Sequence, residues 1–370
     1  MTNSVDAQFV VDDAALVQWC ETADAASHVA LDTEFERQKT YFAELCLVQI
    51  SALNSIICID PLNGLDLAPL ADYLSAPERT KVVHSARQDL EVMHFSGITV
   101  SDGLEDTQIA AALAGFADQI GYAELVHKLL DVTLDKSQTR TNWAQRPLTD
   151  LQLSYAADDV RYLGAAHEIL IEKLDGLGRL PWLREDCTAL VDIELIDPPV
   201  ERAWQRVKGL TGLHDRAFSR GTALAAWRER TARERNLPRG WVVKDADLVA
   251  LAMHDTQDGR ALDAAISEQS ALLRRSRDVI VEVLTDADRQ PPPERPPVPG
   301  TAARQLAKHL AAKVRARAEE LGIGAGVLMT RREMELVLCG QMPTRLVSGW
   351  RAHALQDVLA DVASGAPSAP

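Results

Sequence analysis

The sequence predicts a layered α/β domain followed by all-helical modules. Over roughly the first 190 residues, short runs rich in Val and Ile alternate with segments of helical apolar spacing, which is typical of a mixed α/β domain. After residue 198 the strand signals largely vanish and the sequence becomes helix-rich. Six prolines between residues 291 and 300 then form a stretch typical of a polyproline II spacer.

The individual elements follow from the period of the apolar residues. Four strands rich in β-branched residues are expected at 28–35, 45–51, 55–61 and 80–85. Five helices are expected over 67–74, 88–95, 107–116, 122–130 and, as one long helix, 148–174. Thr149, followed by Asp150, is the expected N-cap of the long helix.

Composition and cysteine usage narrow the class of protein. Of 370 residues, 46% are hydrophobic and 25% charged, as in globular proteins. No apolar run approaches the ~20 residues that cross a bilayer, and the acidic N-terminal stretch lacks the basic region of a signal peptide. Five scattered cysteines without a C-x-x-C pair argue against a disulfide scaffold and a zinc site. We therefore expect a cytoplasmic protein without a membrane partner.

The net charge of −15 is divided unevenly along the chain. Residues 1–200 hold 13 basic and 33 acidic residues, net −20, whereas residues 201–370 hold 26 basic and 21 acidic residues, net +5. Acidic clusters suit cations and basic surfaces suit phosphate. The two halves are therefore expected to have separate roles.

Four acidic residues and one tyrosine occupy positions that suit metal-assisted chemistry. Asp32 and Glu34 are two residues apart on a strand and project to the same side. Asp89 follows another strand end, and Tyr155 precedes Asp159 by four residues, which places both on one helix face. Two divalent ions about 4 Å apart can activate water and stabilise both oxygens of a phosphodiester cleavage. Taken singly, each residue could equally be a helix-dipole, packing or solvated group, so the joint pattern carries the hypothesis.

Three segments resemble the exonuclease motifs of the DEDD superfamily of 3′-5′ exonucleases. They are LDTEF at 31–35, HSARQDLEV at 84–92 and YAADD at 155–159. The third segment, with its tyrosine, resembles the motif of the subgroup in which a tyrosine orients the attacking water. More specifically, residues 28–174 resemble the ribonuclease D family, also at EDTQIAAAL (105–113) and across 135–163. That resemblance implies a ribonuclease H-like mixed sheet flanked by helices.

The resemblance also implies the roles of the site residues. It makes Asp32, Glu34, Asp89 and Asp159 ligands of two divalent ions, Mg²⁺ or Mn²⁺, and it makes Tyr155 the catalytic tyrosine. Asp158 is adjacent to Asp159, but the Y-x-x-x-D spacing selects Asp159, because neighbours on a helix point about 100° apart. We expect Asp158 to be a solvated or capping charge.

The segment before the long helix supplies candidate substrate contacts. Lys136, Arg140 and Arg146 could contact phosphates, and Trp143 could stack on a terminal base. Internal packing of Trp143 and Arg146 is an equally good interpretation. Asp106, Gln108 and His84 are expected to support the fold.

Two segments of the helical half, ERAWQRVKGL at 201–210 and ALAAWRERTARERNLPRGWVVKDADLVALA at 223–252, resemble the HRDC modules of helicases and ribonuclease D. Residues 201–250 hold 11 basic and 6 acidic residues, which favours phosphate contacts, although an ordinary solvated helix face would look similar. Glycines at 322, 324 and 326 are expected to mark a helix end. The expected segments are an exonuclease domain (1–198), a first HRDC domain (199–287), a linker (288–300), a second HRDC-like domain (301–363) and a disordered tail (364–370).

The sequence thus predicts a metal-dependent 3′-5′ exoribonuclease that releases nucleoside 5′-monophosphates. The family likeness implies precursor tRNA as the substrate, and no obligate protein partner is implied. A DNA-directed exonuclease of the same superfamily is the nearest rival, since discrimination depends on contacts to the 2′-OH. A non-catalytic nucleic-acid adaptor would be expected to lack at least one of the acids, and a purely structural α/β protein would leave the motifs unexplained.

Overall fold

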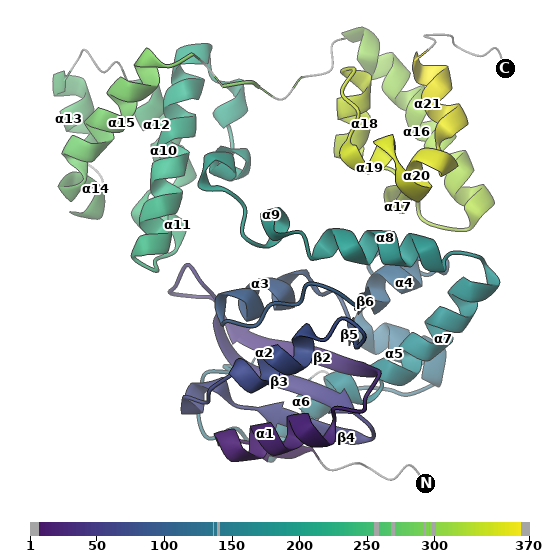
Figure 1. Cartoon of the computed structure of the whole chain (residues 1–370). Helices are drawn as coiled ribbons and strands as arrows, with labels where there is room; N and C mark the ends of the chain where they lie inside the picture. Colours follow the sequence, from purple (N-terminus) through teal and green to yellow (C-terminus); the bar gives the residue numbers. More distant parts are fainter. Residues whose placement is uncertain are drawn as a thin grey trace. The chain divides into compact units, whose positions relative to one another are not determined.

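The computed structural model describes residues 7–135, 137–138, 141–254, 259–267, 271–291, 293–295, 297 and 301–363 (Figure 1). The chain divides into two compact units. We call Met1–Glu36, Leu45–Asp192 and Pro297–Pro370 the sheet unit, and Arg37–Glu44 with Ile193–Pro296 the helical unit. Each is described by itself below.

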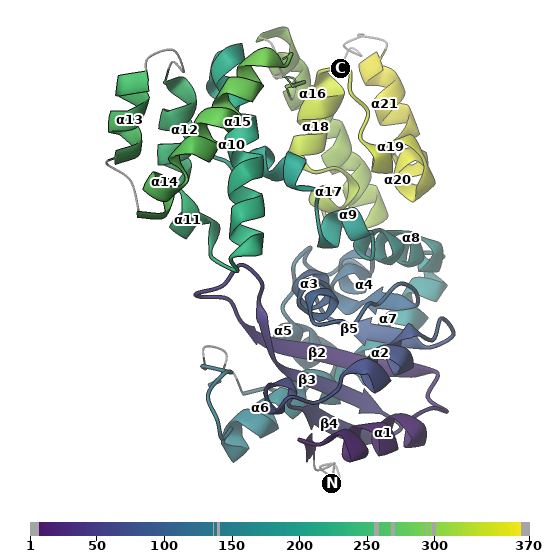
Figure 2. The same ribbon diagram turned by 60° about the vertical axis from the view of Figure 1, so that its left-hand side comes forward.

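A six-stranded mixed sheet is the frame of the sheet unit (Figure 2). Its strands are β1 (Gln8–Val10), β2 (His28–Glu36), β3 (Glu44–Ala52), β4 (Ser55–Ile59), β5 (Thr80–Val83) and β6 (Leu104–Asp106). The order across the sheet is β1-β4-β3-β2-β5-β6. β4 pairs antiparallel with β3, and β5 runs parallel to both β2 and β6. The four predicted strands are confirmed, whereas β1 and β6, with three residues each, are too short to show a period in sequence.

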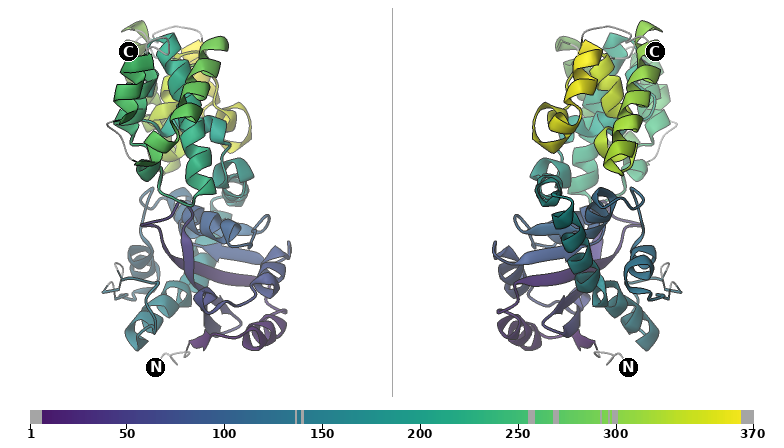
Figure 3. Two further views of the ribbon diagram at one scale, coloured as in Figure 1. Left: turned by 90° about the vertical axis from the view of Figure 1, so that its left-hand side faces the viewer. Right: turned by 90° about the vertical axis from the view of Figure 1, so that its right-hand side faces the viewer.

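Helices cover both faces of this sheet. They are α1 (Asp13–Thr22), α2 (Ala68–Ser75), α3 (Arg87–Phe95), α4 (Thr107–Leu113), α5 (Tyr122–Leu130), α6 (Asp150–Arg161), α7 (Leu163–Gly176) and α8 (Leu180–Leu190). Helices α1 and α2 pack together on one face, and α6 lies on the other (Figure 3). The predicted mixed sheet flanked by helices is thereby confirmed.

The predicted long helix over 148–174 is divided into α6 and α7 at Tyr162. The break lets α6 pack on β4 and β2 while α7 packs on β2 and β5. Its predicted start is confirmed, because the Thr149 hydroxyl accepts the backbone N–H of Gln152 and the Gln152 side-chain oxygen accepts the backbone N–H of Thr149. This capping box fixes the first turn of the helix that carries Tyr155 and Asp159.

The C-terminal helices belong to the sheet unit. They are α16 (Thr301–Leu321), α17 (Ala325–Leu328), α18 (Arg331–Leu338), α19 (Thr344–Val347), α20 (Gly349–Ala354) and α21 (Gln356–Ala363). The rings of Trp182 on α8 and Trp350 on α20 stack with centroids 4.4 Å apart, and the Trp350 backbone N–H donates to Glu185. Arg351 adds a buried ion pair with Asp186. Helix α20 therefore packs directly on α8 through apolar and charged contacts.

The chain after α16 approaches the segment around Gly115 and Asp118 closely. The helix ends at Leu321, as predicted, and Gly322 has φ +63. A Cβ at Gly324 would lie 1.7 Å from a carboxylate oxygen of Asp118, and one at Gly115 would lie 2.8 Å from the Gly322 carbonyl oxygen. Glycine is required here because the two segments approach too closely for a side chain.

The short helix η1 (Pro61–Asn63) also belongs to the sheet unit. The helical unit has its own helices around its own core. They are α9 (Ile193–Ile196), η2 (Val200–Arg206), η3 (Leu210–Gly212), α10 (Asp215–Glu234), α11 (Arg239–Val242), α12 (Asp245–Met253), α13 (Gly259–Ser267), α14 (Ala271–Arg275) and α15 (Arg277–Arg289). The 20-residue helix α10 is central and contacts η2, α12 and α15. Part of the basic charge read from the sequence is internal, because Arg220 and Arg228 are buried in ion pairs with Asp288 and Asp245. The predicted linker lies partly, and the predicted tail wholly, outside the described residues.

Among the helices that the structure describes, none has the length and apolar character needed to cross a membrane.

Candidate active site

The carboxylates of β2 face the helix that carries the third motif. Side chains alternate along a strand, so Ala30, Asp32 and Glu34 share one side of β2. Ala30 packs in a cluster with Ala157 and Val160, the latter two on α6. The strand thus directs its two acids toward α6.

Asp159 completes a compact acidic cluster on this face. Asp32, Glu34 and Asp159 each offer a carboxylate oxygen, and these three oxygens all lie within 4.8 Å of one another. All three residues are partly accessible. Two come from neighbouring positions of one strand and the third comes from α6, so the cluster depends on the packing of α6 against the sheet.

Asp89 enters from the first turn of α3. It is 7% exposed, and its carboxylate accepts a 2.5 Å hydrogen bond from the hydroxyl of Thr33 on β2. The turn that leads into α3 is shaped by Asp106, whose carboxylate accepts the backbone N–H groups of Ser85 and Ala86 at 3.0 and 2.9 Å. Asp106 therefore fixes the turn from which α3 and Asp89 start, and it supports the fold, as expected.

The pKa values of all four carboxyls are raised. Burial raises the pKa of Asp32 well above its usual range, and the charges of Asp89, Asp159 and Glu34 raise it further. Burial, followed by the charges of Asp159 and Asp89, raises the pKa of Glu34 to about 8. Burial also raises the pKa of Asp159 to about 7 and that of Asp89 to about 6, the latter opposed by the Thr33 hydrogen bond. The four carboxyls are therefore difficult to ionise together, and a bound cation would stabilise their ionised forms.

Tyr155 lies one helical turn before Asp159 on α6 and is partly exposed. Its ring packs beside Trp143, with centroids 6.0 Å apart. The spacing of four residues places the phenol on the same helix face as the Asp159 carboxylate. The tyrosine of the third motif is thus positioned on the helix face that supplies the cluster.

Asp158 is held away from the cluster, as expected. Its carboxylate accepts a 2.7 Å hydrogen bond from Arg161, and its backbone carbonyl accepts one from the hydroxyl of Tyr122 at 3.0 Å. Tyr122 was not identified from the sequence. Burial and the charge of Asp159 raise its pKa well above the usual range, and no local sequence signal marks its position in the α5 helix.

The four candidate substrate contacts have mixed outcomes. Lys136 and Arg140 lie outside the described residues. Trp143 is only 3% exposed, in a cluster with Cys46 and Ala156. Arg146 forms two hydrogen bonds with Asp60, at 2.6 and 2.7 Å, and another with the Cys46 carbonyl oxygen.

For Trp143 and Arg146, the structure therefore has the internal packing that the sequence left open. The Trp143 ring lacks an exposed face on which a base could stack, and the Arg146 guanidinium already binds a buried carboxylate. His84 is similarly engaged, with ring nitrogens 2.9 Å from the Thr107 hydroxyl and 3.0 Å from the Ile120 carbonyl oxygen. Gln108 also donates to the Ile120 carbonyl oxygen.

The donor set fits a hard divalent cation. It consists only of carboxylate oxygens, the ligands that Mg²⁺ and Mn²⁺ prefer over nitrogen and sulfur. In the described part of the chain, neither a lysine nor an arginine forms an ion pair with Asp32, Glu34 or Asp159. The negative charge of the cluster is thus available to ions from solution.

Comparison with known proteins identifies similar nucleases. A family described as 3′-5′ exonuclease matches residues 7–175, and the HRDC domain family matches residues 219–283. The chain is 37% identical to ribonuclease D of Acidiphilium cryptum (strain JF-5) over 327 residues, which cover 83% of each chain. It is 37% identical to ribonuclease D of Jannaschia sp. (strain CCS1) over 355 residues, which cover 91% of this chain and 90% of that one.

Among solved structures, the chain is similar to Escherichia coli RNase D, described as an exoribonuclease involved in structured RNA processing. The TM-score is 0.87 at 30% identity, with 98% of this chain and 100% of that chain covered. The catalytic core of RRP6 from Trypanosoma brucei has a TM-score of 0.58 at 20% identity over 78% of this chain, a likeness of fold.

Proposed function

Because this chain belongs to the ribonuclease D family of 3′-5′ exoribonucleases, we propose that it trims 3′ extensions of precursor tRNA by a two-metal-ion mechanism. It would release nucleoside 5′-monophosphates one at a time. The observation that carries this proposal is the cluster of Asp32, Glu34 and Asp159, whose oxygens lie within 4.8 Å of one another.

The four acids would divide the work of holding two divalent ions. Asp32, central in the cluster, is the proposed shared ligand, Glu34 and Asp159 complete one shell, and Asp89 supports the other. Two ions bound there would supply Lewis-acid stabilisation of charge on the attacking and leaving oxygens. Mg²⁺ is the proposed ion, and Mn²⁺ has the same ligand preference.

Tyr155 would orient the attacking water. A phenol donates and accepts hydrogen bonds but is neutral near pH 7, so it can hold a water without competing with the carboxylates for metal. Its position one turn before Asp159 favours this role. The buried packing of Trp143 against Tyr155 would keep the ring from turning away.

RNA would also be held by the helical unit. Trp241 on α11 is 55% exposed, and Lys244 and Arg235, close to it in sequence, are exposed as well. An exposed aromatic with nearby cations suits a single-stranded 3′ extension, because bases stack on the ring while cations meet phosphate. We propose this surface of α11 as a substrate contact.

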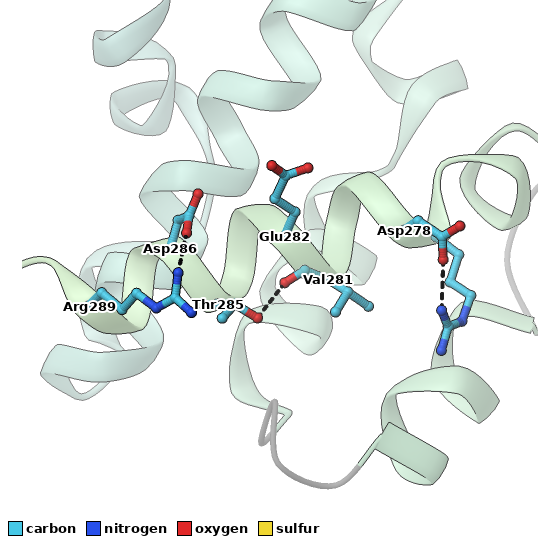
Figure 4. Close-up of a pocket in the computed structure, with 7 residues that line it drawn as sticks. Asp278, Val281, Glu282, Thr285, Asp286 and Arg289 are labelled. Carbon is cyan, nitrogen blue, oxygen red and sulfur yellow. Dashed lines mark hydrogen bonds and ion pairs between the residues drawn. The ribbon is translucent and has the colours of Figure 1, made fainter.

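The exposed face of α15 does not suit RNA. A hollow there is lined by residues of this one helix, including Asp278, Glu282 and Asp286 (Figure 4). Its two arginines already pair with acids, Arg289 with Asp286 and Arg277 with Asp278. The face is therefore acidic or neutralised, and phosphate would be repelled.

A degradation time course tests the proposal. Wild type, Asp32→Asn and the matched control Asp158→Asn would be incubated with Mg²⁺ or with chelator. The substrates would be a 3′-extended tRNA, the mature tRNA and single-stranded DNA of the extension sequence. We expect stepwise loss of 3′ nucleotides from the extended tRNA, with 5′-monophosphate products, in wild type and Asp158→Asn alone.

Other results would contradict specific parts of the proposal. Activity that survives in chelator would contradict the metal mechanism. Equal rates on DNA would contradict RNA as the substrate class, and equal degradation of mature and extended tRNA would contradict a trimming role. For the α11 surface, Trp241→Ala should raise KM for the extended tRNA several-fold to about 100-fold, given about 1–3 kcal/mol per stacked base, and leave kcat unchanged.

A further inference from the structure

The turn between the two central strands belongs to the other unit of the molecule. Strand β2 ends at Glu36, two residues after Glu34, and β3 begins at Glu44. Residues Arg37–Glu44, which join these strands, are grouped with the helical unit. A segment of only eight residues is thus continuous at both ends with the strands of the carboxylate site while packing among helices encoded more than 150 residues later.

Tyr41 is the centre of this packing. It is 9% exposed and lies in the apolar core of the helical unit with Phe218 and Trp227 of α10. Its hydroxyl donates to Glu229 at 2.6 Å and accepts hydrogen bonds from Arg233 and Arg239, both at 3.0 Å. The hydroxyl is therefore fully used, with one donor and two acceptor interactions.

The acid that receives this bond is itself firmly held. Glu229 is 2% exposed, and Arg239 donates to both of its oxygens, at 2.6 and 2.8 Å. The guanidinium of Arg239 also lies 4.6 Å from the centre of the Tyr41 ring. A buried carboxylate that is held by a bidentate, charge-assisted pair is a rigid partner for a tyrosine hydroxyl.

Asn236 holds the backbone of the same turn. Its side-chain oxygen accepts the N–H groups of Tyr41 and Phe42, at 3.1 and 3.0 Å. Asn236 follows α10 with φ +47, a left-handed conformation that is uncommon for residues other than glycine. Residues of the helical unit therefore form hydrogen bonds with both the Tyr41 side chain and the backbone of the turn.

We propose that Tyr41 is a positioning residue that anchors the helical unit to the β2–β3 hairpin and so presents bound RNA to the carboxylate site. The inference rests on the proposed function. The chain passes between the two units on both sides of this turn, at residues 36–37 and 44–45, and again at residues 192–193 and 296–297. A module joined by chain alone samples many positions, and a fixed attachment raises the effective concentration of its bound substrate at the site.

Two substitutions loosen this anchor without emptying the core. Tyr41→Phe removes only the hydroxyl. Asn236→Gly removes the acceptor of both backbone bonds while tolerating φ +47. Tyr73→Phe is the matched control, because Tyr73 is also buried and its hydroxyl donates to the Ala23 carbonyl oxygen within the sheet unit. None of these residues is part of the proposed catalytic machinery.

The experiment measures kcat and KM with Mg²⁺ on a 3′-extended tRNA and on a diribonucleotide, which is too short to engage a second binding surface. We expect Tyr41→Phe and Asn236→Gly to raise KM for the extended tRNA about tenfold. We expect kcat on that substrate and all kinetics on the diribonucleotide to match wild type and Tyr73→Phe. Hydrogen exchange of residues 37–44 should be faster in both variants.

The inference and the proposed function fail in different ways. An inactive wild type would overturn the proposed function. An active wild type whose KM for tRNA is unchanged in both variants, despite faster exchange at the turn, would overturn the anchor. Equal losses on tRNA and diribonucleotide would also overturn it, since the turn would then be shaping the catalytic site itself. If hydrogen exchange at residues 37–44 is as slow in both variants as in wild type, these hydrogen bonds do not hold the turn and the anchor is overturned.

Discussion

Two groups of buried carboxylates in this molecule behave in opposite ways. In the sheet unit, burial and mutual repulsion raise the pKa of Glu34 to about 8. In the helical unit, burial also disfavours the charge of Glu229, but hydrogen bonds from Arg239 and Tyr41 outweigh it and hold the pKa below the usual range. Glu229 is nevertheless the more buried of the two, at 2% exposed.

The difference is the source of the compensating charge. Glu229 receives its cations from within the chain, so its cluster is complete and serves the structure. Described lysines and arginines make no ion pair with Asp32, Glu34 or Asp159. Burial alone therefore does not distinguish a structural acid from a functional one, whereas the absence of an internal partner does.

Removing one acid from the uncompensated cluster should give the largest effect on activity. Asp32→Asn is expected to lower kcat by at least about 10³-fold, as for loss of a group that stabilises charge in the transition state. The same substitution should raise the melting temperature of the chelated protein, because it relieves repulsion among the remaining carboxylates. Steady-state kinetics measures the loss of kcat, and thermal denaturation in chelator measures the rise in melting temperature.

The matched control is Asp158→Asn, which removes a charge from the adjacent position. Asp158 pairs with Arg161, so this variant should keep its activity and gain no stability. An Asp32→Asn protein that melts lower than wild type in chelator would contradict the view of the cluster as repulsive.

Removing the acid from the compensated cluster should have the opposite effect on stability. Glu229→Gln leaves the Arg239 guanidinium, whose side chain is 34% exposed, and the buried Tyr41 hydroxyl without their charged partner, which we expect to cost about 1–3 kcal/mol. Urea denaturation should show this loss in the free energy of unfolding. Glu234→Gln, at the exposed end of the same helix, should be nearly neutral, and equal stability of the two variants would contradict the comparison.

The acidic cluster could be predicted from sequence because its signals are local. The D-x-E pair lies on one strand and the Y-x-x-x-D pair on one helix, and each period fixes which side chains share a face. The structure brings Asp32, Glu34 and Asp159 together as those periods require. Asp89 was also identified, but its link to β2 through Thr33 spans 56 residues and has no local signature.

The remaining contacts could not be predicted because they join distant segments. Tyr41 and Glu229 are 188 residues apart, and Arg351 and Asp186 are 165 apart. Periodicity predicts that a face is buried but does not identify its partner. Trp143 and Arg146 show the same limit, since their residue types suit both RNA and the core, and only the position of Asp60 shows that Arg146 faces inward.

The raised pKa values give a smaller, pH-dependent difference between the clusters. In metal-free protein, folded Glu34, Asp159 and Asp89, with pKa values of about 8, 7 and 6, retain protons that the unfolded chain loses above about pH 4. The free energy of unfolding should therefore fall as pH rises from about 4 to 8.

Mg²⁺ should reverse this trend, because it replaces the lost protons. At about 100 times its dissociation constant it adds about 2.7 kcal/mol, and we expect a rise in melting temperature that is larger at pH 8 than at pH 5.5. The Asp32→Asn protein should show little of this rise. A Mg²⁺ effect independent of pH would contradict a carboxylate site that competes with protons.

The smallest expected effect concerns a side-chain hydrogen bond that favours ionisation of Asp89. The Thr33 hydroxyl donates to Asp89 and lowers its pKa against the effect of burial. Thr33→Val keeps the shape of the side chain but removes this donor, so the pKa of Asp89 should rise further. A net hydrogen bond of about 0.5–1.5 kcal/mol corresponds to about 0.4–1 pH unit, and the acidic limb of the kcat/KM profile should move to higher pH by that amount. Thr222→Val, which removes a hydroxyl bonded to a helix carbonyl on α10, should leave the profile unchanged. A Thr33→Val profile that loses height without moving along the pH axis would mean that the Thr33 hydroxyl positions the Asp89 carboxylate without tuning its pKa.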